Sequence, residues 1–380
     1  MQREKALQVS LAFAALASVA TAQVRNLGDV TTLTVPTTPS ANMDYVNAKA
    51  MDLPMSLTYV DPVQAQVTAL LTASSFGTAG ISDGSPGTGA QSPVSLGTPP
   101  SASADNAAGG FTSQEFGTSG QSFSTARADL SGLTTTNSYP YRAAGKLFFN
   151  IGASTFVCSA SLIKRGIVVT AAHCAAKYGA SKFHSNWRFV PAYRSGLAPF
   201  NTWTVRQAWV KTSYFNGTDG CLSGVVCPND VAVLTLNTIG GGYAGTATGW
   251  LGYGWNGYGF SGNTTHLSQL GYPVCLDNGQ LMERNDSGAF VSASLKSNTV
   301  IGSLMCGGSS GGPWALNLGV RPALTGTTSG SAALSNVVVG VTSWGYTSTA
   351  VKQQGGSPFT TNNIVSLVNS ACGAVPGACI

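Results

Sequence analysis

Residues 166–174 read Gly-Ile-Val-Val-Thr-Ala-Ala-His-Cys, a short apolar run that ends in a histidine beside a cysteine. Short runs of this β-branched kind, bounded by glycine, predict β-strands. Similar runs occur on both sides of it, at 146–149, 231–236, 299–303 and 337–342. Many short strands with frequent turns predict an all-β sandwich or barrel.

One helix is expected, at the end of the chain. Asn362 and Asn363 are suitable caps, and Ile364, Val365, Leu367 and Val368 follow with helical spacing. This run predicts a short C-terminal helix packed on the β-domain.

Charge and composition restrict the class of protein. Charged residues make up 9% of the 380 residues, against roughly 25% in an average soluble protein. This low content excludes a charged coiled coil or a charge-rich disordered chain. The net charge of +5 is spread along the chain with no Lys/Arg run. Because nucleic-acid binders normally carry a basic stripe, we expect no nucleic-acid partner.

The N-terminus has the features of an export signal. Residues 1–5 carry two basic residues, an apolar run follows to about residue 19, and Ala20-Thr21-Ala22 supplies a small-residue cleavage pattern. We therefore predict a signal peptide at 1–22. The alternative, an uncleaved membrane anchor, is disfavoured because the apolar run is short for a spanning helix.

Residues 23–142 differ in composition from the rest of the chain. Within 71–130, Ser, Thr, Gly and Pro fill 33 of 60 positions, which predicts a flexible linker. All eight Cys and all seven Trp lie after residue 142. We therefore expect a globular domain at 143–380, preceded by a propeptide or a stalk at 23–142.

Three segments carry the chemical signal. His173 follows the run described first, Asp230 opens a second apolar run, and Ser310 lies in Gly-Ser-Ser-Gly-Gly-Pro at 308–313. A serine hydroxyl needs a histidine base to act as a nucleophile, and a buried carboxylate fixes that histidine. Glycines around the serine let backbone N–H groups point at a developing oxyanion.

Other residues compete for these roles. Asp219 lies in a Gly-Thr-Asp-Gly turn and is expected to be a turn residue. Ser309 neighbours the nucleophile, but the Ser-Gly-Gly-Pro register favours Ser310. His184 and His266 are expected at the surface or in turns. An α/β-hydrolase is excluded, because that fold needs a histidine after the serine and none follows Ser310.

With these residues, the stretch 143–380 resembles a trypsin-like serine peptidase of the chymotrypsin fold. The stretch 139–149, where the domain begins, and the Gly-Tyr-Pro at 271–273 further resemble the bacterial glutamyl-endopeptidase-like, or V8-like, branch. The resemblance implies an all-β fold of two six-stranded antiparallel β-barrels. It also implies a secreted serine endopeptidase that works through an acyl-enzyme.

The resemblance assigns roles residue by residue. His173 is the general base, Asp230 its orienting partner and Ser310 the nucleophile, and the amides of Gly308 and Ser310 form the oxyanion hole. Substrate binding falls to a primary pocket and the strand that walls it. The implied residues are Leu304, Ser343, Trp344 and Gly345.

The chain departs from its relatives at three positions. Trypsin-like enzymes usually place Asp before the nucleophile to receive the new N-terminal ammonium, and Ser309 cannot form that ion pair. Leu304 replaces the Asp that selects Arg or Lys. Ser343 replaces the His that precedes Trp-Gly in glutamate-specific members. These departures favour an uncharged side chain at the cleavage position.

The eight cysteines form an even set, which in an exported chain indicates disulfides. The resemblance implies a Cys158–Cys174 bridge. Proximity in sequence favours Cys221–Cys227 and Cys372–Cys379, and Cys275–Cys306 then remains by elimination. Zinc is a weak alternative, because the chain has no C-x₂-C pair and three His in total.

The sequence thus predicts a secreted, monomeric endopeptidase acting on proteins or peptides. It predicts no cofactor, no metal, and no membrane association after signal removal. The alternative is a catalytically inactive homologue that serves binding or adhesion.

Overall fold

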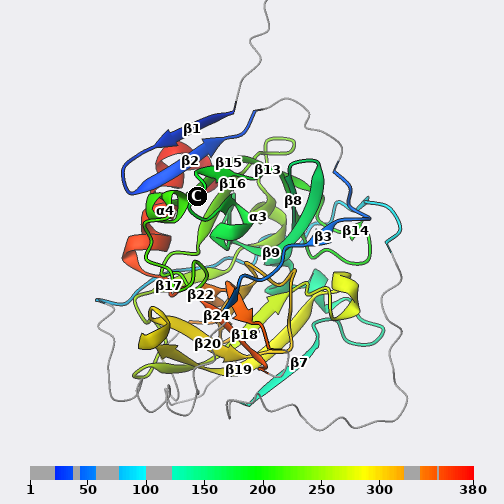
Figure 1. The fold of residues 1–380 in the computed structure, drawn as a ribbon. Helices are drawn as coiled ribbons and strands as arrows, with labels where there is room; N and C mark the ends of the chain where they lie inside the picture. Colours follow the sequence, from blue (N-terminus) through cyan, green and yellow to red (C-terminus); the bar gives the residue numbers. More distant parts are fainter. Residues whose placement is uncertain (1–21, 37–42, 57–76, 100–121, 321–333, 349–350) are drawn as a thin grey trace, which may run out of the picture.

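A computed structural model describes residues 22–36, 43–56, 77–99, 122–320, 334–348 and 351–380. Most strands in the described part of the chain belong to two β-sheets, drawn one above the other in Figure 1. Residues 1–21 of the expected signal peptide lie outside the described residues. So do 71–76 and 100–121 of the expected linker.

The first sheet contains a closed six-stranded antiparallel barrel. Its strands pair in the order β15, β13, β8, β9, β10 and β16, and β15 pairs with β16 to close the ring. The sheet also includes β1, β2 and β3. Its strands are β1 (Gln23–Asn26), β2 (Val30–Thr34), β3 (Lys49–Ala50), β8 (Ala144–Ile151), β9 (Ser154–Lys164), β10 (Ile167–Thr170), β13 (Ser185–Pro191), β15 (Trp203–Lys211) and β16 (Ala232–Leu236).

The second sheet is built around another six-stranded run, in the order β22, β21, β18, β19, β20 and β24. A single bridge between Gly340 and Pro358 joins β22 to the chain just past β24. The strands of this sheet are β4 (Met55–Ser56), β5 (Gly80–Ser82), β7 (Phe123–Arg127), β17 (Gly252–Trp255), β18 (Thr264–Gly271), β19 (Glu283–Ser292), β20 (Asn298–Gly302), β21 (Pro313–Leu316), β22 (Val337–Val341), β23 (Trp344–Tyr346) and β24 (Gln353–Gly356).

The mostly-strand fold agrees with the sequence prediction, but the second sheet is larger than the six strands expected. Strand β17 joins it by parallel pairing with β22, and β4 by parallel pairing with β23. Two small two-stranded sheets complete the strands, namely β11 (Ala176–Lys177) with β12 (Lys182–Phe183), and β6 (Val94–Ser95) with β14 (Leu197–Ala198).

Several strands come from residues 23–142. Among the described residues, β1, β2 and β3 extend the first sheet, whereas β4, β5 and β7 extend the second. Strand β2 pairs with β15 over five residues, and β7 pairs with β19 over five. Edge strands expose unpaired N–H and C=O groups, so added strands of this kind satisfy them.

Helices are short and few in the described chain. They are α2 (Thr212–Asn216), α3 (Ala244–Thr248) and α4 (Ser366–Ala374), which follows a π-helical turn at Thr361–Val365. Single 3₁₀ turns occur at Thr135–Asn137, Tyr141–Ala143, Ala172–Cys174, Asp277–Gly279, Ala293–Leu295 and Pro376–Ala378. No helix among the described residues is long and apolar enough to cross a membrane.

The C-terminal helix is present, but its cap differs from the expected one. Thr360 accepts the bond from the backbone N–H of Asn363, and the Asn363 side chain in turn accepts from the N–H of Thr360. The helix buries Leu367, Val368 and Ala371. Asn363 therefore acts as the third residue of a capping box and not as the cap itself.

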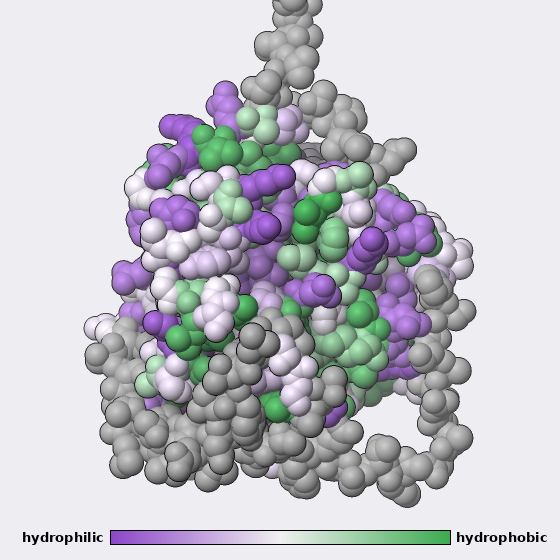
Figure 2. All heavy atoms as spheres, in the orientation of Figure 1, coloured by the Kyte–Doolittle hydropathy of each residue, from purple (hydrophilic) through white to green (hydrophobic). Residues whose placement is uncertain are grey.

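The core of the first barrel is formed by strands that are buried on both faces. Strand β10 is buried at all four positions and β16 at all five, and both belong to the same hydrophobic cluster. On the face drawn in Figure 2, hydrophobic residues lie in small groups among hydrophilic ones.

Candidate active site

His173 lies just after β10, in the 3₁₀ turn Ala172–Cys174, and is 4% exposed. The Cys158–Cys174 disulfide ties this turn to β9. The backbone N–H of His173 donates to Oδ1 of Asp230 at 2.8 Å, and its Nδ1 lies 2.8 Å from Oδ2 of the same carboxylate. A carboxylate only accepts, so Nδ1 carries the proton and Nε2 is left with a lone pair that can accept one.

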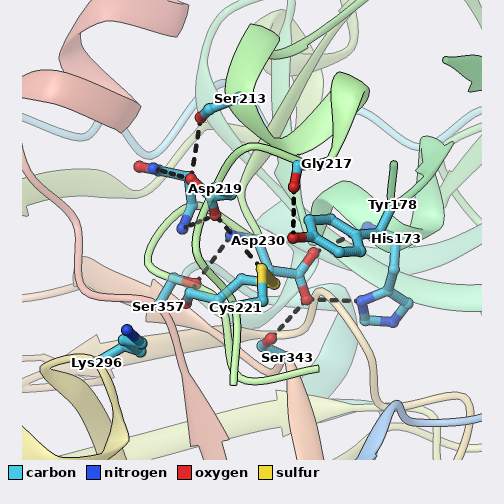
Figure 3. The surroundings of a disulfide bond; sticks show 12 residues. His173, Tyr178, Ser213, Gly217, Asp219, Cys221, Asp230, Lys296, Ser343 and Ser357 are labelled. Atoms are coloured by element: carbon cyan, nitrogen blue, oxygen red, sulfur yellow. Dashed lines mark hydrogen bonds and ion pairs between the residues drawn. A yellow bond between two sulfur atoms is a disulfide. The ribbon is translucent and has the colours of Figure 1, made fainter. Parts of the chain in front are cut away.

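Asp230 precedes β16, is 1% exposed and has a third donor. The hydroxyl of Ser343 donates to Oδ2 at 2.5 Å. The backbone N–H of Asp230 donates to Oγ of Ser357 at 2.9 Å. Figure 3 shows His173 and Ser343 on two sides of the carboxylate. Three donors compensate for the burial of this charge and fix its orientation.

Ser310 lies in the loop between β20 and β21, next to the chain that leads into His173. A Cβ added to Gly311, whose φ is +77°, would lie 1.9 Å from the hydroxyl of Thr170 and 2.8 Å from the N of Ala171. The turn after Ser310 therefore packs directly against the end of β10 and requires glycine. The carbonyl of Ser310 accepts from the N–H of Ser159 at 2.7 Å.

The reactive atoms of the pair have no hydrogen-bond partner. Among the described residues, Nε2 of His173 and Oγ of Ser310 are both buried without one. Ser310 is 0% exposed. Buried polar atoms in native proteins are generally paired, and a catalytic role is one of the reasons for leaving one unpaired.

Gly308, one of the two predicted oxyanion residues, lies two residues before Ser310 in the same loop. Gly308 has φ +94°, and its carbonyl accepts from the hydroxyl of Ser159 at 2.9 Å. Its N–H donates to the carbonyl of Met51 at 3.2 Å. The Gly308 amide is thus directed toward a carbonyl oxygen from outside its own loop, as oxyanion stabilisation requires.

Neutral side chains hold the loop where trypsin-like enzymes use an ion pair. The hydroxyl of Ser309 donates to the carbonyl of Cys306 at 2.7 Å. Nε2 of Gln354 donates to Ser309 Oγ at 3.2 Å and to the carbonyl of Met305 at 2.8 Å. Gln269 continues this network, because its Nε2 donates to Oε1 of Gln354 at 2.5 Å. The loop is therefore ordered by uncharged groups.

Comparison with known proteins assigns the family. A family model described as trypsin matches residues 131–364. The chain belongs to the trypsin family.

Among solved structures, the protease Anisep from Arthrobacter nicotinovorans has a TM-score of 0.50 at 27% identity, covering 61% of this chain and 96% of its own. The thermostable serine protease AL20 from an extremophilic microorganism has a TM-score of 0.50 at 26% identity, covering 60% and 96%. A Glu endopeptidase has a TM-score of 0.45 at 17% identity, covering 65% and 95%. No curated protein matches.

Three of the residues predicted to bind substrate differ from one another in their environment in this trypsin-family chain. Trp344 is 0% exposed and donates from Nε1 to Oδ1 of Asn298 at 2.8 Å. The N–H of Gly345 donates to the carbonyl of Pro54 at 3.1 Å. Leu304 is half-buried and lines a cleft of about 760 Å³ together with Arg127 and other residues.

Two residues that the sequence assigned to the surface or to a turn are buried near the site. His184 is 7% exposed, stacks on Phe149 and approaches the carbonyl of His173 with Nε2 at 3.0 Å. Asp219 is also 7% exposed and accepts from Ser213 and from the side chain and backbone of Asn229. The surface expectation for His184 was wrong, because a short motif does not reveal which loops fold inward. Asp219 lies in a bend of the loop after α2, which agrees with its expected turn position, but it is buried there. His266 is exposed, as expected.

Burial also changes the ionisation of these two groups. Burial lowers the pKa of His184 to about 4. Burial raises the pKa of Asp219, although hydrogen bonds from Asn229 and Ser213 oppose the shift. His184 is therefore a neutral donor to the backbone beside the base.

The structure contains the four disulfides Cys158–Cys174, Cys221–Cys227, Cys275–Cys306 and Cys372–Cys379. These are the pairs expected from the sequence. Among the residues that the structure describes, two groups of His, Cys and Asp have ligand atoms close together, but both contain disulfide-bonded cysteines. A disulfide sulfur offers no thiolate, so neither group indicates a metal site.

Proposed function

We propose that the chain is a secreted serine endopeptidase that hydrolyses peptide bonds with His173, Asp230 and Ser310. The observation that carries this proposal is the pair of hydrogen bonds from His173 to Asp230, one from the backbone N–H and one from Nδ1. That arrangement aligns the imidazole and leaves Nε2 as a base. The packing of Gly311 on Thr170 and Ala171 brings the serine loop to the same place.

The proposed reaction follows the roles of these atoms. Ser310 Oγ attacks the scissile carbonyl carbon as its proton passes to Nε2 of His173. The new imidazolium is stabilised by Asp230, and the oxyanion by the amides of Gly308 and Ser310. The C–N bond then breaks, and the proton on Nε2 moves to the leaving amine. Water, activated by the same nitrogen, hydrolyses the acyl-enzyme.

Two sequence features support export. The segment 1–22 is proposed to be removed as a signal peptide, and four disulfides are the usual feature of an oxidising compartment. In this proposal 143–380 is the peptidase domain, and 23–142 is a propeptide or stalk. The mature enzyme is monomeric and acts on proteins or peptides without a cofactor.

A substitution series tests the nucleophile. Ser310→Ala should abolish labelling by a fluorophosphonate probe and reduce turnover on the order of 10⁶-fold. Ser309→Ala is the matched control, since it removes the neighbouring hydroxyl and should still be labelled. Labelling that depends on Ser309 and survives in Ser310→Ala would refute the assignment. A folded chain that no probe labels in any form would instead favour the inactive homologue.

A further inference from the structure

A segment from the N-terminal region crosses the proposed active site. Residues 49–56, here called the covering segment, begin at β3, which pairs in parallel with β9 at Phe156 and Val157. The N–H of Met51 donates to the carbonyl of Val157 at 2.9 Å, and the carbonyl of Met51 accepts from Gly308 at 3.2 Å. The covering segment thus occupies the amide that is proposed to stabilise the oxyanion.

The covering segment then continues along the proposed substrate strand. The carbonyl of Pro54 accepts from the N–H of Gly345 at 3.1 Å, and β4 pairs in parallel with β23. Leu53 is 6% exposed, whereas Asp52 is exposed. The segment is therefore held by backbone bonds at both ends and in the middle, with a buried side chain between them.

The direction of the segment is opposite to that of a substrate. In the proposed reaction, the residue whose carbonyl is attacked enters the pocket walled by Ser343–Gly345, and the residues before it follow the same strand. Here the carbonyl beside Gly308 belongs to Met51, but the residues after it, at 54–56, lie along β23. The residues before it, at 49–50, lie along β9. The residues after Met51 therefore lie where the acyl side of a substrate would bind, and the residues before it lie where the leaving side would bind.

We propose that the covering segment is a built-in inhibitor that binds its own active site in reverse. It places a carbonyl at the oxyanion amide without presenting the following peptide bond for cleavage, so it blocks the site and is not consumed. The proposal rests on the proposed function. It explains why Ser310 and His173 are only 0% and 4% exposed, although a protein substrate must reach both.

Displacement of the segment tests this inhibition in the full-length chain. Leu53→Asp puts a charge where an apolar side chain is buried. The equilibrium constant between the covered and the uncovered active site should therefore fall at least about tenfold. Fluorophosphonate labelling of Ser310 should accelerate by about the same factor. Leu133→Asp, at a position 57% exposed in the same N-terminal region, is the control and should leave the rate unchanged. Mass measurement confirms that each chain is intact.

Hydrogen exchange gives a readout that does not need activity. In a Ser310→Ala background, the amides of Gly308 and Gly345 should be protected, and Leu53→Asp should remove that protection. Unchanged exchange and unchanged labelling would overturn the inhibitory role. Loss of protection with no labelling of Ser310 would leave the position of the segment intact and refute the proposed function, and the inhibition with it.

A reversible lock provides the complementary test. A Cβ added at Gly307 would lie 3.5 Å from the Cβ of Ala50, within the range for a disulfide. Adding Ala50→Cys and Gly307→Cys to the Leu53→Asp chain should return labelling to the wild-type rate or below. Mild reduction that spares the native disulfides should restore the fast rate. Fast labelling of the oxidised, cross-linked chain would contradict a covering role.

Discussion

His184 should make the stability of this protein sensitive to acid. Its ring is buried, and Nε2–H donates to the carbonyl of His173. Burial lowers the pKa of His184 from 6.5 to about 4, so the charged ring is disfavoured in the folded state. The corresponding contribution to stability is complete above pH 6.5. It is lost progressively as the pH falls from 6.5 to about 4, because the unfolded chain takes up the proton first.

The size of the effect follows from the shift. A difference of about 2.5 pKa units, at about 1.4 kcal/mol per unit, gives up to about 3.5 kcal/mol. His184→Gln places an amide N–H where Nε2 is and does not titrate. It should therefore retain the bond to His173 and lose the pH dependence.

The assay is urea unfolding at pH 7 and pH 4, with both chains in a Ser310→Ala background to prevent self-cleavage. The decrease in unfolding free energy between the two pH values should be about 2–3 kcal/mol larger with His184 than with Gln. Other titrating groups cancel in this difference. Equal decreases in the two chains would refute the reasoning and show that the ring is solvated or already charged in the folded state.

Further predictions concern buried polar groups around the site. Burial and the neighbouring Asp277 raise the pKa of Glu283 to about 8, so this group stabilises the fold below pH 4.5 and loses that contribution as the pH rises through 8. Glu283→Gln should therefore raise the free energy of unfolding at pH 9 by roughly 1–3 kcal/mol and change it little at pH 4, a result checked by urea titration. Gln354→Leu leaves the carbonyl of Met305 and the hydroxyl of Ser309 without this donor, and should cost about 2–4 kcal/mol and slow probe labelling. An unchanged melting temperature would mean that this network does not order the loop. Because Leu304 and Ser343 stand where charge-selecting relatives carry Asp and His, peptide-library profiling should show cleavage after uncharged residues, and dominant cleavage after Arg, Lys or Glu would contradict this.

Local sequence was sufficient to predict the fold class. The β-branched runs between glycines predict β8, β10, β16, β20 and β22, because strands buried on both faces need continuous apolar sequence. The residues around His173, Asp230 and Ser310 form short motifs whose chemistry is readable from neighbours in the chain. The proximity of cysteines in sequence was likewise enough to indicate the small disulfide loops.

Contacts between distant segments could not be predicted in this way. The hydroxyl of Ser343 donates to Asp230 across 113 positions, and His184 becomes a buried donor only because its loop folds inward. The second sheet gains β17 and β4 through parallel pairings with strands far along the chain.

The covering segment shows most clearly what the sequence determined and what tertiary structure decided. Its sequence, Lys-Ala-Met-Asp-Leu-Pro-Met-Ser at 49–56, has no motif that distinguishes it from other mixed stretches. The sequence alone determined a charge-poor β-domain with a His, Asp and Ser in order. Only the fold decided which strands this segment joins and in which direction. Its backbone N–H and C=O groups make those pairings, and every residue type except proline carries both groups.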